Sequence, residues 1–132
     1  MLIKALSVLK KCVFIITIFY SLALATVCLI DFKKLPDVGI SFADKIFHSL
    51  TYTLLAFLWF NTLVFQFKMG NKKAIIYASA ISIVFGMIVE VLQGVFTSTR
   101  HADVLDVLAN SLGVLFMACL LLLKNRITVK KL

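Results

Sequence analysis

Acidic residues are few in this sequence, which has six Asp and Glu against fourteen Lys and Arg among its 132 residues. Cysteines are also few. Cys12, Cys28 and Cys119 are odd in number and lack metal-binding spacing, so we interpret them as small core or lipid-facing residues. No stretch alternates apolar and polar residues as the strands of a transmembrane barrel do, which excludes that class. No basic helix or aromatic-basic platform lies outside the apolar runs, which argues against nucleic acid as a partner.

Long apolar runs dominate the sequence. Apolar residues make up 62% of the chain and the mean hydropathy is +1.07, both far above the values of a soluble domain. Four runs, at about residues 12–30, 47–67, 74–97 and 104–123, are each long enough to cross ~30 Å of hydrocarbon as a helix. The sequence therefore predicts an all-α membrane protein, a single module over residues 1–132 that forms a compact bundle of four transmembrane helices in a lipid bilayer.

The first run has a second interpretation, as a signal peptide. Lys4, Lys10 and Lys11 precede it, and its later part contains Ala23-Leu24-Ala25. However, the run is longer than an ordinary signal-peptide core, and cleavage after Ala25 would leave the apolar residues TVCLI behind. We therefore favour an uncleaved first span; a mature start at Thr26 would change the number of helices only.

Charged residues divide unevenly between the two sides of the predicted bundle. Ten basic residues lie before the first run, in the 68–73 loop or after the last run, and four lie on the other side: Lys33, Lys34, Lys45 and Arg100. The positive-inside rule then places both termini in the cytoplasm. The six acids all lie on the outward side or in the outer part of a run: Asp31, Asp37, Asp44, Glu90, Asp103 and Asp106.

The outer half of each later run carries one polar stripe, since residues three, four and seven positions apart share a helix face. The 1.5 Å rise per residue puts Glu90, His48 and Asn110 at a similar depth, roughly 7–10 Å below the ends of their spans. The short STRHAD loop makes the last two spans antiparallel neighbours and holds Arg100 and His101 above the stripes. The predicted ligand-binding cluster comprises Asp44, Lys45, His48, Tyr52, Glu90, Gln93, Arg100, Asp103, Asp106 and Asn110.

Small residues lie on the same faces. Gly86, Gly94 and Gly113 are predicted to let the spans approach closely, so that leucine at Gly86 or Gly113 would push the third and fourth spans apart. The alternative is that these glycines face lipid.

Several cluster residues also have structural interpretations. Ser41-Phe-Ala-Asp44 is a capping-box pattern, and Asp103 and Asp106 fit the first turn of the fourth span, where acids suit the helix dipole. His48 alone fits a hydrogen-bonded core histidine, and Tyr52 fits an interfacial aromatic residue.

Glu90 has no local structural role of this kind. Its helix runs outward, so the partially negative C-terminal end lies near the carboxylate, and the residues four positions away are Gly86 and Gly94. An ionisable residue at membrane depth costs roughly 2.5–3.5 kcal/mol on insertion scales. We therefore expect a donor from another element, either in a functional site or in a structural bridge between helices; the candidates are Lys45, His48 and Arg100.

The charges of the predicted cluster do not balance, because four acids face two bases, Lys45 and Arg100, if both histidines are neutral. A carboxyl kept protonated, a protonated histidine, a bound metal or a cationic ligand group would each restore the balance. Neither His-x-x-x-His nor Glu-x-x-His spacing is present, so no metal or other cofactor is predicted.

Motifs over about residues 35–120 resemble those of the VanZ-like family of small integral membrane proteins. They are Asp44-Lys45-x-x-His48-x-x-x-Tyr52, Glu90-x-x-Gln93, Arg100 and Asp106-x-x-Ala109-Asn110-x-x-Gly113. The resemblance implies a compact multi-pass module in the bacterial cytoplasmic membrane, linked in the namesake to resistance against the lipoglycopeptide teicoplanin. It implies no mechanism and no catalytic residue.

Two classes of function remain open. In the first, the protein is an accessory or binding module that recognises an envelope lipid or its head group, with Lys45 and Arg100 as donors to phosphate or carboxylate. In the second, it is an intramembrane enzyme acting on such a lipid. The absence of G-x-S-x-G and H-E-x-x-H motifs argues against the enzyme, for which the candidate catalytic groups are Glu90, His48 and Asp106, with Asp103 as another acid. Ion or proton transport ranks third, because a cluster confined to the outer half offers no relay inward.

Overall fold

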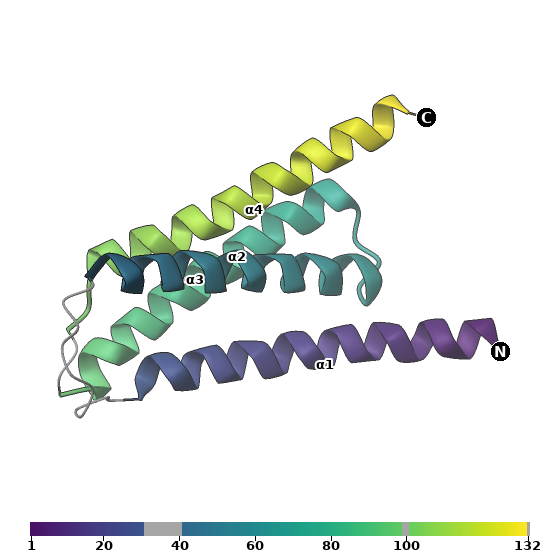
Figure 1. Ribbon diagram of the computed structural model, residues 1–132. Coiled ribbons are helices and arrows are strands. Elements are labelled where there is room, and N and C mark those ends of the chain that lie inside the picture. Colours follow the sequence, from purple (N-terminus) through teal and green to yellow (C-terminus); the bar gives the residue numbers. More distant parts are fainter. Residues whose placement is uncertain (31–40, 99–100, 132) are drawn as a thin grey trace.

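The computed structural model describes residues 1–30, 41–98 and 101–131, and the described part is helical apart from short connections. The four helices are α1 (Leu2–Leu29), α2 (Ser41–Phe65), α3 (Asn71–Phe96) and α4 (Val104–Lys130), as Figure 1 shows. Each is long and apolar enough to cross a membrane, which confirms the prediction of an all-α chain with four such helices.

The helices extend beyond the predicted apolar runs. α1 begins at Leu2 rather than near residue 12, and α4 continues to Lys130 rather than ending near residue 123. Lys and Arg are good helix formers, so the charged flanks continue the helices that the apolar runs begin. The apolar run therefore marks the part suited to hydrocarbon, whereas the helix is longer.

Helices α2, α3 and α4 form the centre of the bundle, and α1 lies to one side. α2, α3 and α4 contact one another, whereas α1 packs against α2 and α3 and, within the described residues, does not contact α4. The short connection of α3 to α4 makes them antiparallel neighbours, as predicted. Both termini and the α2–α3 connection lie at one end of the bundle (Figure 1).

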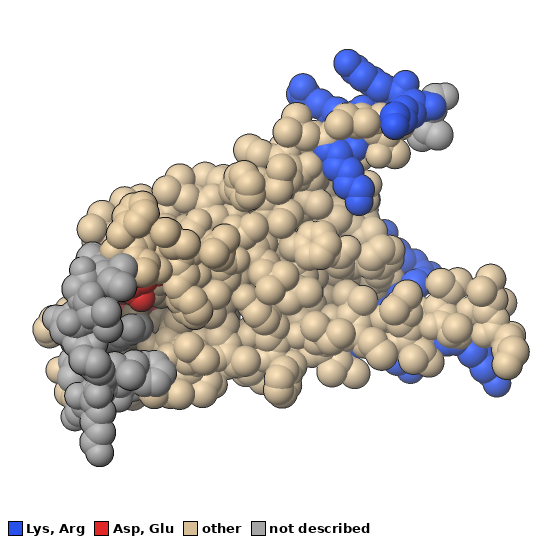
Figure 2. All heavy atoms as spheres, in the orientation of Figure 1, with Lys and Arg blue, Asp and Glu red and all other residues tan. Residues whose placement is uncertain are grey.

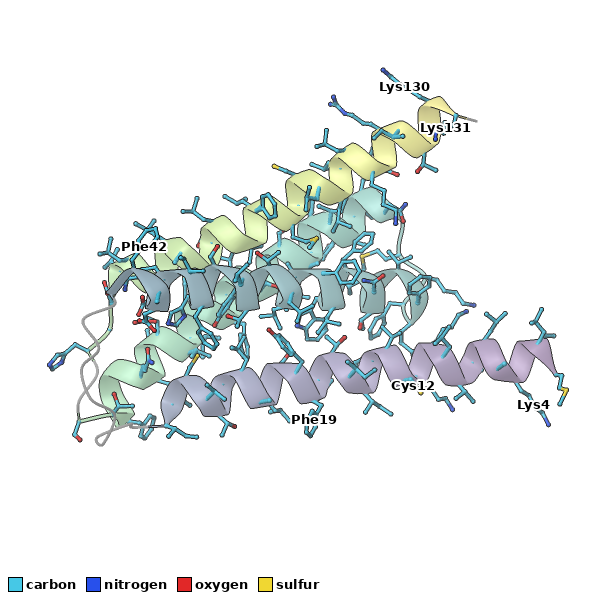
Figure 3. The ribbon with its side chains drawn as sticks, viewed as in Figure 1. Lys4, Cys12, Phe19, Phe42, Lys130 and Lys131 are labelled. Atoms are coloured by element: carbon cyan, nitrogen blue, oxygen red, sulfur yellow. The ribbon has the colours of Figure 1, made fainter. Side chains whose placement is uncertain are left out.

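Apolar side chains pack inside the bundle and also cover its outside. One buried cluster joins all four helices and includes Leu24, Leu55, Val89 and Val114. Large apolar side chains on the outside, such as Phe19 and Phe42, point away from the bundle (Figure 3). A helix that is apolar all round suits a lipid environment, so the exposed side chains do not need a protein partner to explain them.

Hydrogen bonds between helices supplement this packing. The hydroxyls of Thr17 in α1 and Thr62 in α2 lie 2.7 Å apart, and the Tyr20 hydroxyl donates to the Thr51 carbonyl at 2.8 Å. Thr53 donates to the Gly113 carbonyl at 3.0 Å and so connects α2 to α4. Such bonds are worth ~0.6 kcal/mol on average in a membrane bundle, so packing is still required.

The glycines face protein, but not in the arrangement that was predicted. A Cβ at Gly113 would collide with the carbonyl oxygen of Ser49, so this glycine brings α4 against α2 rather than against α3. A Cβ at Gly86 would lie 2.9 Å from the Tyr52 ring and 3.3 Å from the Asn110 amide. The expectation that leucine at Gly113 would separate the third and fourth spans is therefore wrong, because the crowded pair is α2 and α4.

Charged residues gather at opposite ends of the molecule. Lys and Arg cluster at the end that holds the termini, and acidic atoms are visible at the other end (Figure 2). Lys4, Lys130 and Lys131 extend from the helix tips at the basic end (Figure 3). We call the opposite end, where α2 and α4 begin and α1 and α3 finish, the polar end.

Candidate functional site

An ion-pair network at the polar end connects α2 to α4. The ammonium group of Lys45, on the first turns of α2, lies 2.6 Å from Asp103 Oδ2 and also donates to Asp106 Oδ1. Asp103 is the N-cap of α4 and Asp106 lies in its first turn. Two carboxylates therefore share one lysine, whose side chain is 21% exposed.

Asp103 contributes three different groups to this network. Its Oδ1 accepts the Leu105 backbone N–H at 2.9 Å, which confirms the predicted capping role. Its Oδ2 accepts from Lys45, and its own backbone N–H donates to Glu90. Hydrogen bonding to Lys45, followed by the Leu105 N–H, lowers the pKa of the Asp103 carboxyl, which keeps this carboxyl ionised.

Glu90 is 4% exposed, and its Oε1 accepts the Asp103 backbone N–H at 2.6 Å. One donor does come from another element, as expected, and among the described residues it is the backbone N–H at the start of α4. The positive end of the α4 dipole thus compensates a carboxylate that lies near the negative end of α3. Lys45 was predicted as a donor to Glu90, but it binds Asp103 and Asp106 instead.

His48 was the second candidate donor to Glu90, and its side chain is also directed elsewhere. Its Nδ1 lies 3.1 Å from Asn110 Oδ1 on α4. Its Nε2 faces Asp106 Oδ2 at 3.7 Å and Asp44 Oδ1 at 3.9 Å. His48 is 2% exposed, so this ring lies among polar groups inside the bundle.

Tyr52 lies deeper in the bundle than the ion-pair network, and Gln93 lies to the side of the network. Tyr52 is 1% exposed, so it is a core residue and not an interfacial one, and no hydrogen-bond partner of its hydroxyl lies among the described residues. The Gln93 amide donates to the Cys28 carbonyl at 2.7 Å and so satisfies one of the last carbonyls of α1. Gln93 therefore has a structural role that its position on the polar stripe did not indicate.

The remaining predicted residues can be placed briefly. Asp44 is 40% exposed and lies beside His48, one helical turn earlier on α2. His101 is exposed, whereas Arg100, the third candidate donor to Glu90, lies outside the described residues. The structure thus brings Asp44, Lys45, His48, Glu90, Asp103, Asp106 and Asn110 together at one end.

The geometry of the cluster limits what it can do chemically. Its described members include four carboxylates and one ammonium group, so negative charge is in excess unless a proton or a cation is bound. His48, Glu90 and Asp106 are buried, whereas the side chains of Asp44 and Asp103 are about two-fifths exposed. Burial strengthens electrostatic interactions, so the buried members of the cluster suit proton transfer or cation binding.

Comparison with known proteins gives no relative for this arrangement: no protein-family model, no curated protein and no solved structure matches the chain.

Proposed function

We propose that the chain is a VanZ-like, multi-pass protein of the bacterial cytoplasmic membrane that acts as an accessory or binding module for an envelope lipid. In this proposal the polar end faces outward and contacts the lipid head group. The observation that carries it is the position of Lys45, whose ammonium group is fixed between Asp103 and Asp106 at the mouth of the cluster.

The ammonium group of Lys45 retains capacity for a ligand. An ammonium group has three N–H donors, and two of those of Lys45 go to the carboxylates. The side chain is one-fifth exposed, so a phosphate or carboxylate oxygen of a head group can reach the third. Arg100 would be a second donor to the same group.

Apolar side chains surround this end of the bundle. Phe42, Phe96 and Val104 are each at least 73% exposed and lie at the helix ends beside the cluster. They offer acyl chains an apolar contact next to polar groups that suit a head group, which is the combination that lipid recognition requires.

The proposal is tested by the lipids that the protein retains. Full-length protein, K45Q and the opposite-end control K72Q are purified in a mild detergent from a bacterial membrane, and their bound lipids are quantified by mass spectrometry. We expect one lipid class to be enriched at least tenfold in the unmodified protein and in K72Q, and lost in K45Q. Identical lipid profiles for all three folded proteins would contradict the proposal. Teicoplanin sensitivity of cells producing these proteins tests whether binding has the consequence that the family resemblance implies.

The orientation is tested separately by cysteine labelling. Cys12, Cys28 and Cys119 are first replaced by serine or alanine, and a single cysteine is introduced at Asn71. The positive-inside rule places this position in the cytoplasm, so we expect no reaction with an impermeant reagent in intact cells and full reaction after lysis. Labelling in intact cells would show that the protein has the opposite orientation.

A second candidate function, an intramembrane enzyme, has one specific observation in its favour. The buried imidazole of His48 lies 3.7 Å from Asp106 Oδ2, so a candidate base and a candidate acid are neighbours, and both are buried at the same end of the bundle as Glu90. Incubating the purified protein with the enriched lipid and measuring product distinguishes the two candidates. Transport receives no comparable support, because the stripe inward from Glu90 consists of Gly86, Ser82 and Ala78, with one hydroxyl and no ionisable group.

A further inference from the structure

The structure assigns a site for a divalent metal ion to Asp44, His48 and Asp106, at the polar end between α2 and α4. One oxygen of each carboxylate and a ring nitrogen of His48 lie within 4.8 Å of one another. This inference does not depend on lipid binding, since it rests on the ligand atoms alone.

Helical spacing explains why these atoms converge. Asp44 and His48 are four residues apart on α2 and therefore share one face, and Asp106 approaches that face from the first turn of α4. The sequence contains neither the His-x-x-x-His nor the Glu-x-x-His spacing. The Asp-x-x-x-His pair presents two ligands in the same way, and the third ligand comes from a helix that is distant in sequence.

Asn110 provides independent evidence, because it orients the imidazole from outside the ligand group. Its amide oxygen accepts a hydrogen bond and cannot donate one, so His48 Nδ1, 3.1 Å away, carries the proton. In the neutral ring, Nε2 then has a lone pair directed at the two carboxylates. A histidine that donates from one nitrogen to an amide or carboxylate oxygen and coordinates through the other is the usual arrangement at metal centres.

The distances are too long for hydrogen bonds and close to those of a coordination shell. His48 Nε2 lies 3.7 Å from Asp106 Oδ2 and 3.9 Å from Asp44 Oδ1, beyond hydrogen-bond reach. Metal–ligand distances of about 2.0–2.2 Å in a tetrahedral shell separate the donor atoms by roughly 3.3–3.5 Å. The two separations from Nε2 exceed this by a few tenths of an ångström, and the two carboxylate oxygens lie within 4.8 Å of each other, so side-chain movements would bring the three atoms into one shell.

Lys45 does not compete for the same atoms. Its ammonium group binds Oδ1 of Asp106, whereas Oδ2 of that carboxylate faces His48. Among the described side chains around the ring, carboxylates outnumber ammonium groups, which also favours a cation of charge +2. One nitrogen and two carboxylate oxygens form a donor set that suits Zn²⁺ or Mn²⁺ better than Ca²⁺ or Cu⁺.

The competing explanation is a protonated His48 that forms ion pairs with the two carboxylates without a metal. Titration of the purified, chelator-treated protein with Zn²⁺ or Mn²⁺ alone, in detergent and without added lipid, separates the two. We expect one ion of at least one of these metals to bind per chain with saturation. D44N is a mild variant, because Asp44 is 40% exposed, and it should weaken binding at least tenfold. H48N should do the same, and N110A should weaken it about tenfold by releasing the ring.

E90Q is the matched control, since it removes one charge from the same pocket and leaves the three ligand atoms in place. Metal affinity should remain within about threefold of that of the unmodified protein. Equal weakening in E90Q and D44N would show diffuse electrostatic attraction and would overturn the assignment. The absence of saturable binding of both metals up to about 1 mM in folded, unmodified protein would overturn it as well. Either result would leave the lipid proposal standing, because retained lipids are measured without added metal.

Discussion

The two ends of this bundle both carry charge, but they hold it in different ways. At the polar end Lys45 is about four-fifths buried, Glu90 and Asp106 are buried further, and all three make hydrogen bonds across helices. At the basic end Lys72 and Lys73 are exposed, and the terminal lysines extend away from the protein (Figure 3). The buried charges constrain which helices can pack together, whereas the exposed ones affect topology and attraction to anionic lipid without shaping the interior.

The helix termini at the two ends of the bundle also differ in how their backbone groups are hydrogen-bonded. The polar end holds the N-termini of α2 and α4. At the start of α4, the Asp103 carboxylate accepts the Leu105 N–H, and the Asp103 N–H donates to Glu90. Gln93 and Thr97 satisfy carbonyls where α1 and α3 finish. In contrast, the N-cap of α3 at the basic end is Gly70, which makes no side-chain capping bond. The first turn of α3, which contains Lys72 and Lys73, therefore begins without a side-chain cap.

The largest effect is expected from overpacking near the polar end. In G113L even the Cβ would meet the backbone of Ser49, so the variant should lose about 3 kcal/mol or more and yield little folded protein. G86L should be less damaging, because the closest contacts of a Cβ at this position are side-chain atoms and not backbone. G70L at the basic end meets nothing within 4 Å and is the control. Thermal unfolding in detergent measures the stability of all three variants. If G113L and G86L are as stable as G70L, Gly113 and Gly86 face lipid instead.

A smaller effect should distinguish the two groups of lysines. K45M leaves Asp103 and Asp106 without their shared cation, and removing one partner of a buried pair costs up to about 3–5 kcal/mol. Since Lys45 is one-fifth exposed, we expect about 1–3 kcal/mol. K72M at the basic end should change stability by less than about 0.5 kcal/mol. If the two variants unfold at the same denaturant concentration, the contrast between the two ends is wrong.

E90Q should change stability by less than about 1 kcal/mol, because the amide oxygen still accepts the Asp103 N–H. The substitution removes the negative charge of Glu90. If the cluster is a site for an envelope lipid, the folded variant should lose lipid retention or the cellular phenotype. If the cluster is only structural, E90Q should retain both wherever it retains the fold.

The smallest effect concerns pH and Asp103. Its pKa is lowered in the folded protein, so its contribution to stability is fully present above the ordinary aspartate value of about 3.9 and is lost as the pH falls through the lowered pKa. D103N should therefore be slightly less stable than the unmodified protein at pH 6, and this difference should disappear in strong acid. If the stability difference between D103N and the unmodified protein grows as the pH falls below about 4, the pKa of Asp103 is not lowered by folding.

Sequence reasoning predicted the number of helices, the neighbouring pair α3 and α4, and the convergence of polar stripes at one end. These follow from apolar run length and from helical periodicity, which are local properties. Asp103 as an N-cap was also predictable, because capping depends on residues within one turn.

The individual partners were not predictable in the same way. Lys45 has several acids within reach, and the choice of Asp103 and Asp106 depends on how α2 and α4 are rotated against each other around Gly113. The donor to Glu90 among the described residues was missed because it is a backbone N–H, and no side-chain pattern marks it. Gln93 was assigned to the cluster by its helix face, although its amide reaches sideways to α1.

The connection of Lys45 to Asp106 also fixes an order of events during synthesis. The two residues are 61 positions apart, so at about 5–20 residues per second the ribosome needs roughly 3–12 s to supply the aspartate after the lysine. α1 carries no acidic residue, whereas α2 and α4 both contribute charged side chains to the polar end. Because both carboxylate partners of Lys45 lie at the start of α4, this network can form only after the last helix has been made. A chain truncated before Asp103 would lack both of these partners.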